Sequence, residues 1–380
     1  MTNSERICKE AGEKFFFKDH VFENLKNVFL TNNNRIELCD ALFEYLNNYI
    51  VIQIKERDSA SLDVVKEQQW MDRVVYEDAV NQINQSIKNI QNEIIYVNDC
   101  YNQKVLLDKS FNLLPVIIFL NPSISDYKRV IRDNGVINVF SLHDFNDMLN
   151  GLIHPSEFIS YLNYRSSLFL CGNNLPDLIT NENDNGIVFS SVKSEADIVA
   201  NYQMQLFDGD KSKMIAAAKV AEIMQKFRSK ILGKKDIEYK KIVSVLSVIK
   251  PEECIFFIDR YEASIEDAKN NKLTFRRFLQ LTVDGKKNGL VFLSSGRDKL
   301  NNQNQYFLIM DSKKIQHQLD ALLLIEFSIT VDGTYDVDWR YDENKYVDDS
   351  QLKSFYEEAG FYNGSISRES LSFFADKMNN

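Results

Sequence analysis

The apolar run from Leu113 to Leu120 constrains the fold of this chain more than any other feature. It is well short of the roughly 20 apolar residues that cross a bilayer, so we expect neither a membrane span nor a membrane partner. A short apolar run that ends at a turn signal, here Asn121-Pro122, is typical of a strand buried on both faces of a sheet.

The residues before this run supply its neighbours. Tyr49 to Arg57 is dense in Ile and Val, and the Asn47-Asn48 break joins it to Ile36–Tyr45, which predicts two strands and a short turn. Trp70 to Asn92 repeats apolar residues along one side with helical spacing, and Ser4 to about Phe17 does the same. The order of these elements predicts an α/β fold, a mixed sheet flanked by helices.

The length of the chain predicts more than one domain. A chain of 380 residues is longer than one core usually supports. A strand at Val136–Phe140 and a helix at Asp144–Leu152 would complete the first domain, and His154-Pro155 marks a boundary. We therefore expect one domain over residues 1–150 and a second region over residues 151–380.

The second region changes character near its middle. It is expected to be mainly helical from Pro155 to about Val248 and strand-rich from Cys254 to Trp339, where glycines mark turns. Helices are expected again after Gln351. No internal repeat or low-complexity tract is present. We expect this mixed α and β region to bind partners or to select substrate.

Charge and cysteine content limit the classes of function. A net charge of -10 argues against a protein that coats nucleic acid by global attraction, so any contact with phosphate must be local. The five cysteines form no CxxC pair, which indicates reduced thiols and disfavours a zinc site. Met1 to Lys14 lacks the apolar stretch of a secretory signal, so we expect a cytoplasmic protein.

Asp40, Gln53 and Lys55 form the constellation that carries chemistry in this sequence. Side chains alternate along a strand, so Gln53 and Lys55 project from one face and the neighbouring isoleucines from the other. A lysine in an otherwise apolar strand is costly without a partner. The turn folds the preceding strand back beside it, and Asp40 is the carboxylate that we expect to pair with Lys55.

This arrangement resembles the restriction-endonuclease-like PD-(D/E)xK superfamily, whose signature is an acidic residue, a spacer and a (D/E)xK motif on the next strand. The resemblance covers roughly residues 5 to 95, and Gln53 replaces the usual acid, as in the branch that is similar to Mrr-type restriction enzymes. It implies that Asp40 and Gln53 hold Mg²⁺ or Mn²⁺ and that Lys55 positions or polarises the attacking water.

Two further residues follow from the same resemblance. In that branch a glutamate on the first helix often completes the metal site, and Glu13 is preferred to Glu10 because it is nearer the end that leads into the sheet. A glutamine on the helix after the motif strand contacts the substrate or the metal shell in such relatives, which implies Gln82. Each also has an ordinary reading as a polar residue on a helix surface.

The residue types suit phosphodiester hydrolysis on chemical grounds. The reaction builds negative charge on phosphoryl and leaving oxygens, which a hard divalent cation and an ammonium group stabilise. The alternative reading of Gln53 and Lys55 is an edge strand with a solvated face, and Asp40 would then be a surface acid near a turn. The four histidines lack metal-ligand spacing, and Ser295-Gly296-Arg297 lacks the lysine of a phosphate loop.

A basic stretch from Lys211 to Lys241 contains ten Lys or Arg against three acids. Lys219, Lys226 and Lys230 would share one helical face, which could steer a phosphate backbone or dock an acidic partner; a solvated face is the alternative. Residues 1–110 contain 13 Lys or Arg against 18 acids, so phosphate contacts from elsewhere would be needed.

The sequence thus predicts a metal-dependent endonuclease that hydrolyses DNA phosphodiester bonds with Mg²⁺ or Mn²⁺. The resemblance implies a setting in prokaryotic defence against phage or plasmids, with a regulatory or sensor protein as a candidate partner of the C-terminal region. Two alternatives stay open. One is a catalytically inactive nuclease fold that serves as a binding or assembly module, and the other is an RNase or tRNA-cleaving toxin on the same fold.

Overall fold

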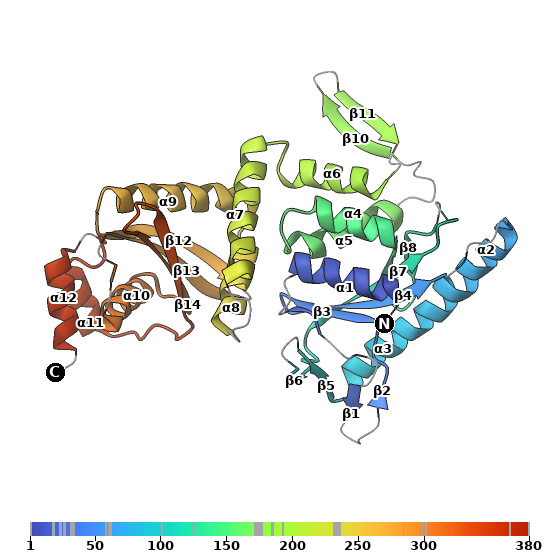
Figure 1. Cartoon of the computed structure of the whole chain (residues 1–380), viewed down its shortest axis with the longest axis horizontal. Helices are drawn as coiled ribbons and strands as arrows, with labels where there is room; N and C mark the ends of the chain where they lie inside the picture. Colours follow the sequence, from blue (N-terminus) through green and yellow to red (C-terminus); the bar gives the residue numbers. More distant parts are fainter. Residues whose placement is uncertain are drawn as a thin grey trace. The chain divides into compact units, whose positions relative to one another are not determined.

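The computed structural model describes the chain from Thr2 to Met378 apart from residues 17–19, 23–24, 26–27, 31–34, 58, 60–62, 100–101, 125–126, 171–177, 184–185, 192–193, 231–236, 284, 298, 301 and 365. The chain is a mixed α/β protein that divides into two compact units, Met1–Gly209 and Asp210–Asn380 (Figure 1). Among the described helices, none is long and apolar enough to cross a membrane.

A mixed sheet of five strands forms the centre of the first unit. Its order is β3-β4-β7-β9-β8, with β4, β7 and β9 parallel and both edge strands antiparallel to their neighbours. The bounds are β3 Ala41–Tyr45, β4 Asn48–Glu56, β7 Asn112–Leu120, β8 Val130–Arg132 and β9 Val136–Ser141. The apolar run singled out in the sequence is the central strand β7, which contributes side chains to the cores on both faces.

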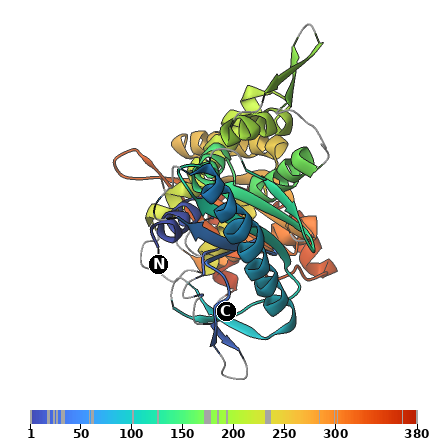
Figure 2. The same cartoon turned by 90° about the vertical axis from the view of Figure 1, so that its right-hand side faces the viewer.

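Helices cover both faces of this sheet (Figure 1). One layer consists of α1 Asn3–Phe16, α4 Leu142–Gly151, α5 Glu157–Leu170 and α6 Glu195–Leu206. The other is a continuous rod of α2 Val64–Trp70, a π-helical segment η3 Met71–Ala79 and α3 Val80–Asn92, followed most easily in Figure 2. The Asp63 side chain starts this rod by accepting hydrogen bonds from the amides of Val65 and Lys66.

Residues 151–209 group with the first unit. Phe158 and Tyr161 of α5 and Ile198 of α6 are buried in the same core as Phe16 of α1. The division of the structure therefore falls after residue 209, whereas the sequence suggested one near residue 150. The reason is that α5 and α6 bury their apolar faces on the layer that α1 and α4 begin.

Two smaller sheets accompany the central one. The first has the order β2-β1-β5-β6, and the second is the hairpin β10-β11. Their bounds are β1 Val28–Leu30, β2 Arg35–Ile36, β5 Ile95–Asn98, β6 Lys104–Leu106, β10 Leu178–Asn183 and β11 Gly186–Ser191. Ile36–Tyr45 is consequently not one strand, because the residues between Ile36 and Ala41 form a connection between two sheets, and Asp40 lies at its end.

The second unit has a four-stranded sheet with the order β12-β13-β14-β15, in which β13 and β14 are parallel. Rings of α9 pack on one face of this sheet, and α10, α11 and α12 share the core on the other. The strands are β12 Thr274–Val283, β13 Lys286–Gly296, β14 Ala321–Ile329 and β15 Tyr335–Asp342. The helices are α7 Lys211–Lys230, α8 Ile237–Ser247, α9 Pro251–Lys269, α10 Gln303–His317, α11 Ser350–Glu358 and α12 Arg368–Lys377.

The helix α9 departs from the prediction that strands begin at Cys254. Pro251 occupies the start of the helix, and the side chain of Glu253 accepts from the backbone N–H of Lys250. Proline in the first turn and a glutamate three residues after the cap are both helix-start signals. These signals make the segment from Pro251 helical, so the prediction of strands from Cys254 is wrong for α9.

Candidate active site

A two-residue turn fixes the register of the hairpin that carries the predicted site. Leu46 and Asn47 have φ values of 46° and 56°, so β3 and β4 are joined by the kind of tight turn whose twist suits a hairpin. The turn lies one residue earlier than the sequence suggested. Ala41 consequently pairs with Ile52, and Asp40, which precedes β3, lies beside β4.

Asp40 continues the hairpin ladder through its side chain. Its backbone N–H donates to Ile52 O at 3.1 Å, and its Oδ2 accepts from Ile54 N at 2.7 Å. The carboxylate therefore lies against the main chain of β4, between the positions of Gln53 and Lys55.

Gln53 and Lys55 lie on the face of the sheet that α3 covers. Ile52 and Ile54 pack in the core beneath α1, whereas Val51 packs in the core beneath α3. Because side chains alternate along a strand, Gln53 and Lys55 belong to the α3 side. Gln53 is buried, with 6% of its surface exposed, and Lys55 is half-buried.

Lys55 takes its hydrogen-bond partner from the helix above it. Its Nζ donates to Gln82 Oε1 of α3 at 2.5 Å. The structure thus pairs Lys55 with Gln82 and, among the described residues, forms no ion pair between Lys55 and Asp40, contrary to the sequence prediction. The physical reason is that the Ile54 amide holds the Asp40 carboxylate near the plane of the sheet, while Lys55 rises out of that plane.

The direction of α1 decides which of its residues lies near the site. Ser4, in the first turn, donates through Oγ to Glu56 Oε2 at 2.6 Å, at the carboxyl end of β4. Gly12, two turns later, lies so close to the Phe43 ring that an added Cβ would stand 2.3 Å from it. The first turn of α1, rather than its last, is therefore the turn nearest the end of β4.

Glu13 consequently lies away from Asp40. Its Oε1 pairs with Lys9 Nζ along the helix at 3.7 Å, and no contact among the described residues joins it to Asp40. The buried glutamate of the first turn is Glu5, whose Oε2 accepts from Thr2 N at 2.9 Å. Glu5 was not predicted as a site residue, because the sequence favoured Glu13, at the end of the helix that leads into the sheet.

The charge of Asp40 affects the pKa of two buried thiols. Cys8 lies in the core beneath α1 and Cys39 in the core beneath α3. Burial raises the pKa of both thiols, and the negative charge of Asp40 raises each pKa further. Both thiols therefore stay protonated, which excludes them as nucleophiles at neutral pH.

The capacity of this site for a metal ion is limited. The part of the chain that the structure describes contains no group of three or more His, Cys, Asp or Glu side chains that could hold a metal. Asp40 offers a carboxylate, and Gln53 offers an amide oxygen. Mg²⁺ keeps several waters and is commonly held by one or two carboxylates together with substrate phosphates. The donor set fits Mg²⁺ in this form, in which the substrate completes the coordination.

A second polar group lies at the carboxyl ends of β4 and β7. Arg57 Nη2 pairs with Glu67 Oε1 at 2.9 Å, and Asn121 Nδ2 donates to Glu67 Oε2 at 2.7 Å. The helix that follows β4 covers one face of the sheet, and the helix that follows β9 covers the other. Open α/β sheets commonly bind ligands outside the carboxyl ends of their strands, and this polar group lies at such ends.

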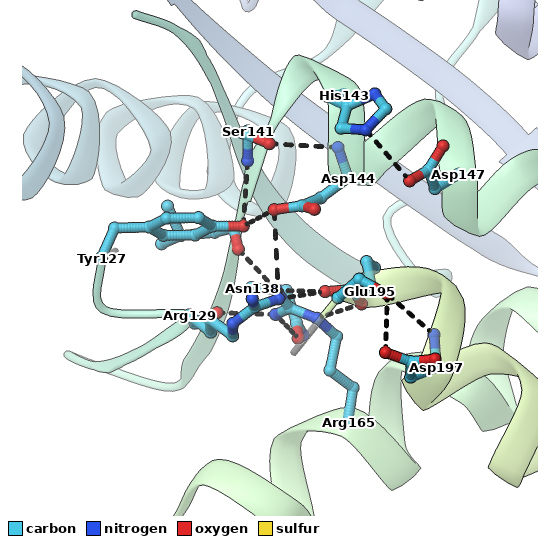
Figure 3. A network of polar contacts seen from close by, with 12 residues as sticks. Tyr127, Arg129, Asn138, Ser141, His143, Asp144, Asp147, Arg165, Glu195 and Asp197 are labelled. Atoms are coloured by element: carbon cyan, nitrogen blue, oxygen red, sulfur yellow. Dashed lines mark hydrogen bonds and ion pairs between the residues drawn. The ribbon is translucent and has the colours of Figure 1, made fainter. Parts of the chain in front are cut away.

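A third polar group lies near the end of β9, where side chains of β9, α4, α5 and α6 form a connected network (Figure 3). Arg165 of α5 is wholly buried and donates to both carboxylate oxygens of Glu195 on α6 and to the carbonyls of Arg129 and Val139. Arg129 forms its own ion pair with Glu195 at 2.6 Å, and Tyr161 donates to the same carboxylate. Since each charge already has partners, this group joins α5 and α6 to the sheet and leaves no charge to bind a ligand.

The basic stretch of the second unit is partly neutralised. Lys219 Nζ pairs with Glu262 Oε1 of α9 at 2.6 Å. Lys226 lines a small cavity together with Tyr261, and the side chain of Lys230 lies outside the described residues. Lys219 would have to leave Glu262 in order to bind a phosphate.

Comparison of the chain with models of protein families, with curated proteins and with solved structures gives no match. The assignment of a function therefore depends on the residues and contacts of the chain itself. In the first unit they place an acid, an amide and a lysine near the carboxyl end of β4.

Proposed function

We propose that the first unit is a metal-dependent nuclease of the restriction-endonuclease-like kind that hydrolyses DNA phosphodiester bonds. The observation that supports this most is the hydrogen bond from Ile54 N to the Asp40 carboxylate, which holds this carboxylate against β4 between the positions of Gln53 and Lys55. An oxygen ligand, an amide and an ammonium group along one strand end are the groups that phosphodiester hydrolysis uses.

Asp40 and the amide oxygen of Gln53 are the residues that would hold Mg²⁺ or Mn²⁺. When bound, such an ion stabilises negative charge on phosphoryl oxygens. Glu13 has no part in this ligand set, because its described partner is Lys9.

Lys55 provides the cation of the chain itself. Its ammonium group is oriented by Gln82, a neutral partner that leaves the positive charge available to a phosphoryl oxygen or an attacking water. A hydrogen bond between an ammonium and an anion is roughly twice as strong as one between neutral groups. Lys55 would therefore exchange Gln82 for the substrate, and Gln82 would act as a positioning residue.

A cleavage assay on plasmid, single-stranded DNA and tRNA, with Mg²⁺, Mn²⁺ or EDTA, tests the proposal. We expect Lys55→Ala and Asp40→Asn to abolish cleavage, whereas Lys66→Ala, which alters a lysine with 67% side-chain exposure on α2, should cleave as the parent does. Asp40→Asn keeps an oxygen that can accept from Ile54 N, so its effect separates chemistry from folding. Cleavage by both Asp40→Asn and Lys55→Ala would place the chemistry elsewhere in the chain.

A second expectation follows from the small number of protein ligands for the metal ion. With one carboxylate, the free protein should bind Mg²⁺ weakly, and metal and nucleic acid should bind together. A ligand that binds only the folded state raises stability according to its occupancy. We expect Mg²⁺ and an oligonucleotide together to raise the Tm of the parent more than the sum of each alone, and to lose this excess in Asp40→Asn. Equal Tm changes in both proteins would separate Asp40 from metal binding.

A catalytically inactive binding module is the second candidate. It is favoured by Gln53 in place of an acid and by the lack, within the described residues, of a group of three acidic, His or Cys side chains. This module would bind nucleic acid without cleaving it under any metal condition. Cleavage of tRNA but not DNA would instead support the RNase alternative.

The source of phosphate contacts is a separate question, because residues 1–110 carry more acids than bases. Reversing Lys219, Lys226 and Lys230 to Glu should weaken DNA binding and flatten its salt dependence by about 0.9 in log-log slope for each lost contact. Because Lys219 is already paired with Glu262, we expect fewer than three contacts to be lost. Unchanged binding would assign the positive surface to a partner protein.

A further inference from the structure

The second unit contains a cavity of about 510 Å³ between α10 and β15. This volume is within the range of about 300–1,000 Å³ that is usual for small-molecule sites. Tyr306 and Phe307 of α10 line it on one side, and Asp338, Arg340 and Asp342 of β15 line it on the other.

Strand register explains why these three residues of β15 meet the helix. Arg340 pairs with Leu324 and Asp342 with Leu322, and both leucines belong to the core beneath α10. Since residues directly opposite each other in a sheet share a face, Arg340 projects toward α10. Trp339 pairs with Ile325 and belongs to the opposite face, although it also borders the cavity.

Arg340 is the charged group of this cavity that forms no ion pair within the described part of the chain. Asp338 pairs with Lys299, and Asp342 Oδ2 pairs with Lys314 Nζ at 2.6 Å. Among the described residues no carboxylate lies within ion-pair distance of Arg340. Its Nε is buried without an acceptor, and its Nη1 reaches Gln303 Oε1 only at 3.4 Å.

The surfaces around Arg340 are flat and aromatic. The guanidinium carbon of Arg340 lies over the Tyr306 ring, 3.7 Å from its centroid, in a cation–π contact. Phe307, the next residue of α10, is 51% exposed and lines the cavity, so a ligand there can reach its ring. Nucleic-acid bases stack on exposed aromatic rings such as that of Phe307.

The polar groups favour a ring with both acceptors and donors on its edges. The fork of an arginine matches two acceptors on one edge, such as O6 and N7 of guanine. Asp338 and Asp342 would repel a carboxylate or a phosphate inside the cavity, but they can accept from ring N–H and amino groups. Gln303 and Asn344 add amides at the margin. A neutral nucleobase meets all of these conditions, and an aromatic acid does not.

We propose that this cavity binds a purine nucleobase, guanine in preference to adenine, with its sugar and phosphate toward solvent. The base could belong to a free nucleotide or to a single strand of nucleic acid. This inference does not depend on nuclease activity of the first unit.

The two tryptophans of the chain make the test direct, because Trp70 lies in the first unit and Trp339 borders the cavity. In a Trp70→Phe protein, Trp339 is the sole tryptophan reporter. We expect saturable fluorescence changes with GMP, weaker binding of AMP and CMP, and no binding of benzoate, with calorimetry on the same samples as a second readout. A short guanine-containing single strand that binds more tightly than GMP would identify the strand as the source of the base, and tighter binding of GMP would identify the free nucleotide.

Variants of the full-length chain then assign the contacts. Arg340→Met should weaken GMP binding by about tenfold or more, as expected for loss of a bidentate arginine contact to a base. Arg340→Lys keeps the charge but lacks the fork, so it should lose the preference for GMP over AMP. Phe307→Ala should also weaken binding. Phe256→Ala is the matched control, because Phe256 is 53% exposed and has Arg260 over its ring at 5.7 Å but borders neither described cavity.

Three results would overturn the proposal. One is the absence of saturable purine binding by both readouts. Another is tighter binding of benzoate than of GMP. The third is unchanged GMP affinity in Arg340→Lys and Phe307→Ala proteins whose circular dichroism and urea unfolding match those of the parent.

Discussion

Replacement of Arg165 by methionine is the most demanding test of how the first unit is held together. Methionine keeps much of the apolar bulk and removes the guanidinium group. The lost contacts are hydrogen bonds to both oxygens of Glu195, at 2.7 and 3.3 Å, and to the carbonyls of Arg129 and Val139, at 2.6 and 2.8 Å. Arg165 also donates to Asn138 Oδ1 at 3.1 Å.

The expected loss of stability follows from what remains around Glu195. Removal of one partner of a buried ion pair costs about 3–5 kcal/mol. Glu195 keeps Arg129 at 2.6 Å, which favours the lower end, about 3 kcal/mol. Two carbonyls that lose a donor add about 1 kcal/mol, so we expect a total of about 4 kcal/mol. A domain of ordinary stability, about 5–15 kcal/mol, would be left marginal.

Urea unfolding in a Trp339→Phe background measures this loss, because Trp70 then reports the first unit alone. Arg6→Met is the matched control, since Arg6 pairs with Glu10 at 2.8 Å but on an exposed helix surface, where such pairs contribute about 0.3–0.5 kcal/mol. Adding Glu195→Gln to Arg165→Met should cost less than the sum of the single changes, because it removes a buried charge that has lost a partner. A loss below about 1 kcal/mol in Arg165→Met would refute the reasoning.

Three other changes test separate features of the structure. Burial raises the pKa of Glu157 to about 7, so the folded state holds an extra proton and the first unit should lose about 3 kcal/mol of stability as pH rises from about 4.5 to about 7. Glu157→Gln, which can still bond to Gln203, should flatten this dependence in urea titrations at several pH values. Burial lowers the pKa of Lys313 to about 8, so the stability of the second unit should rise with pH above that value. Lys313→Met should remove this rise in unfolding experiments that follow Trp339 fluorescence. Gly364→Ala should destabilise the second unit, because φ is +67° and an added Cβ would stand 2.5 Å from Arg276 N. An unchanged Tm in thermal melts of the purified variant would show that the backbone adjusts to the added Cβ.

The hairpin of the candidate site could be predicted from the sequence because its determinants are local. The Ile and Val content of β4 favours a strand, and Asn47 tolerates the positive φ that a two-residue hairpin requires. Leu46, the other turn residue, carries no such signal, which is why the predicted turn lay one residue too late. Alternation along the strand then places Gln53 and Lys55 on one face. These are rules of covalent geometry and short-range packing, which a sequence displays directly.

The partner of Lys55 could not be predicted in the same way. The sequence put Asp40 on the adjacent strand, but it could not show that the Ile54 amide would hold that carboxylate near the sheet plane. Gln82 was named only through a resemblance, and its contact with Lys55 depends on how the rod of α2, η3 and α3 lies across the sheet. Choices between two candidate partners are decided by tertiary packing.

Arg165 and Glu195 had no sequence signal at all. An arginine on an amphipathic helix is usually at the surface, and nothing local distinguishes one that is wholly buried. Thirty residues separate it from its carboxylate, with the hairpin β10-β11 between them. The error in the domain boundary has the same origin, because α5 and α6 were assigned to the second region without knowledge of this contact.

The contrast between these two cations explains why we propose Lys55, and not Arg165, as the cation that would bind a ligand in the first unit. Arg165 is wholly buried and already has a carboxylate and several carbonyls as partners, so no ligand could improve its surroundings. Lys55 is half-buried and its partner, Gln82, is a neutral amide. An anion offers Lys55 a stronger hydrogen bond than an amide does, whereas Arg165 has nothing to gain. A phosphate that binds near the carboxyl end of β4 would therefore replace Gln82 as the partner of Lys55, and the group around Arg165 would stay unchanged.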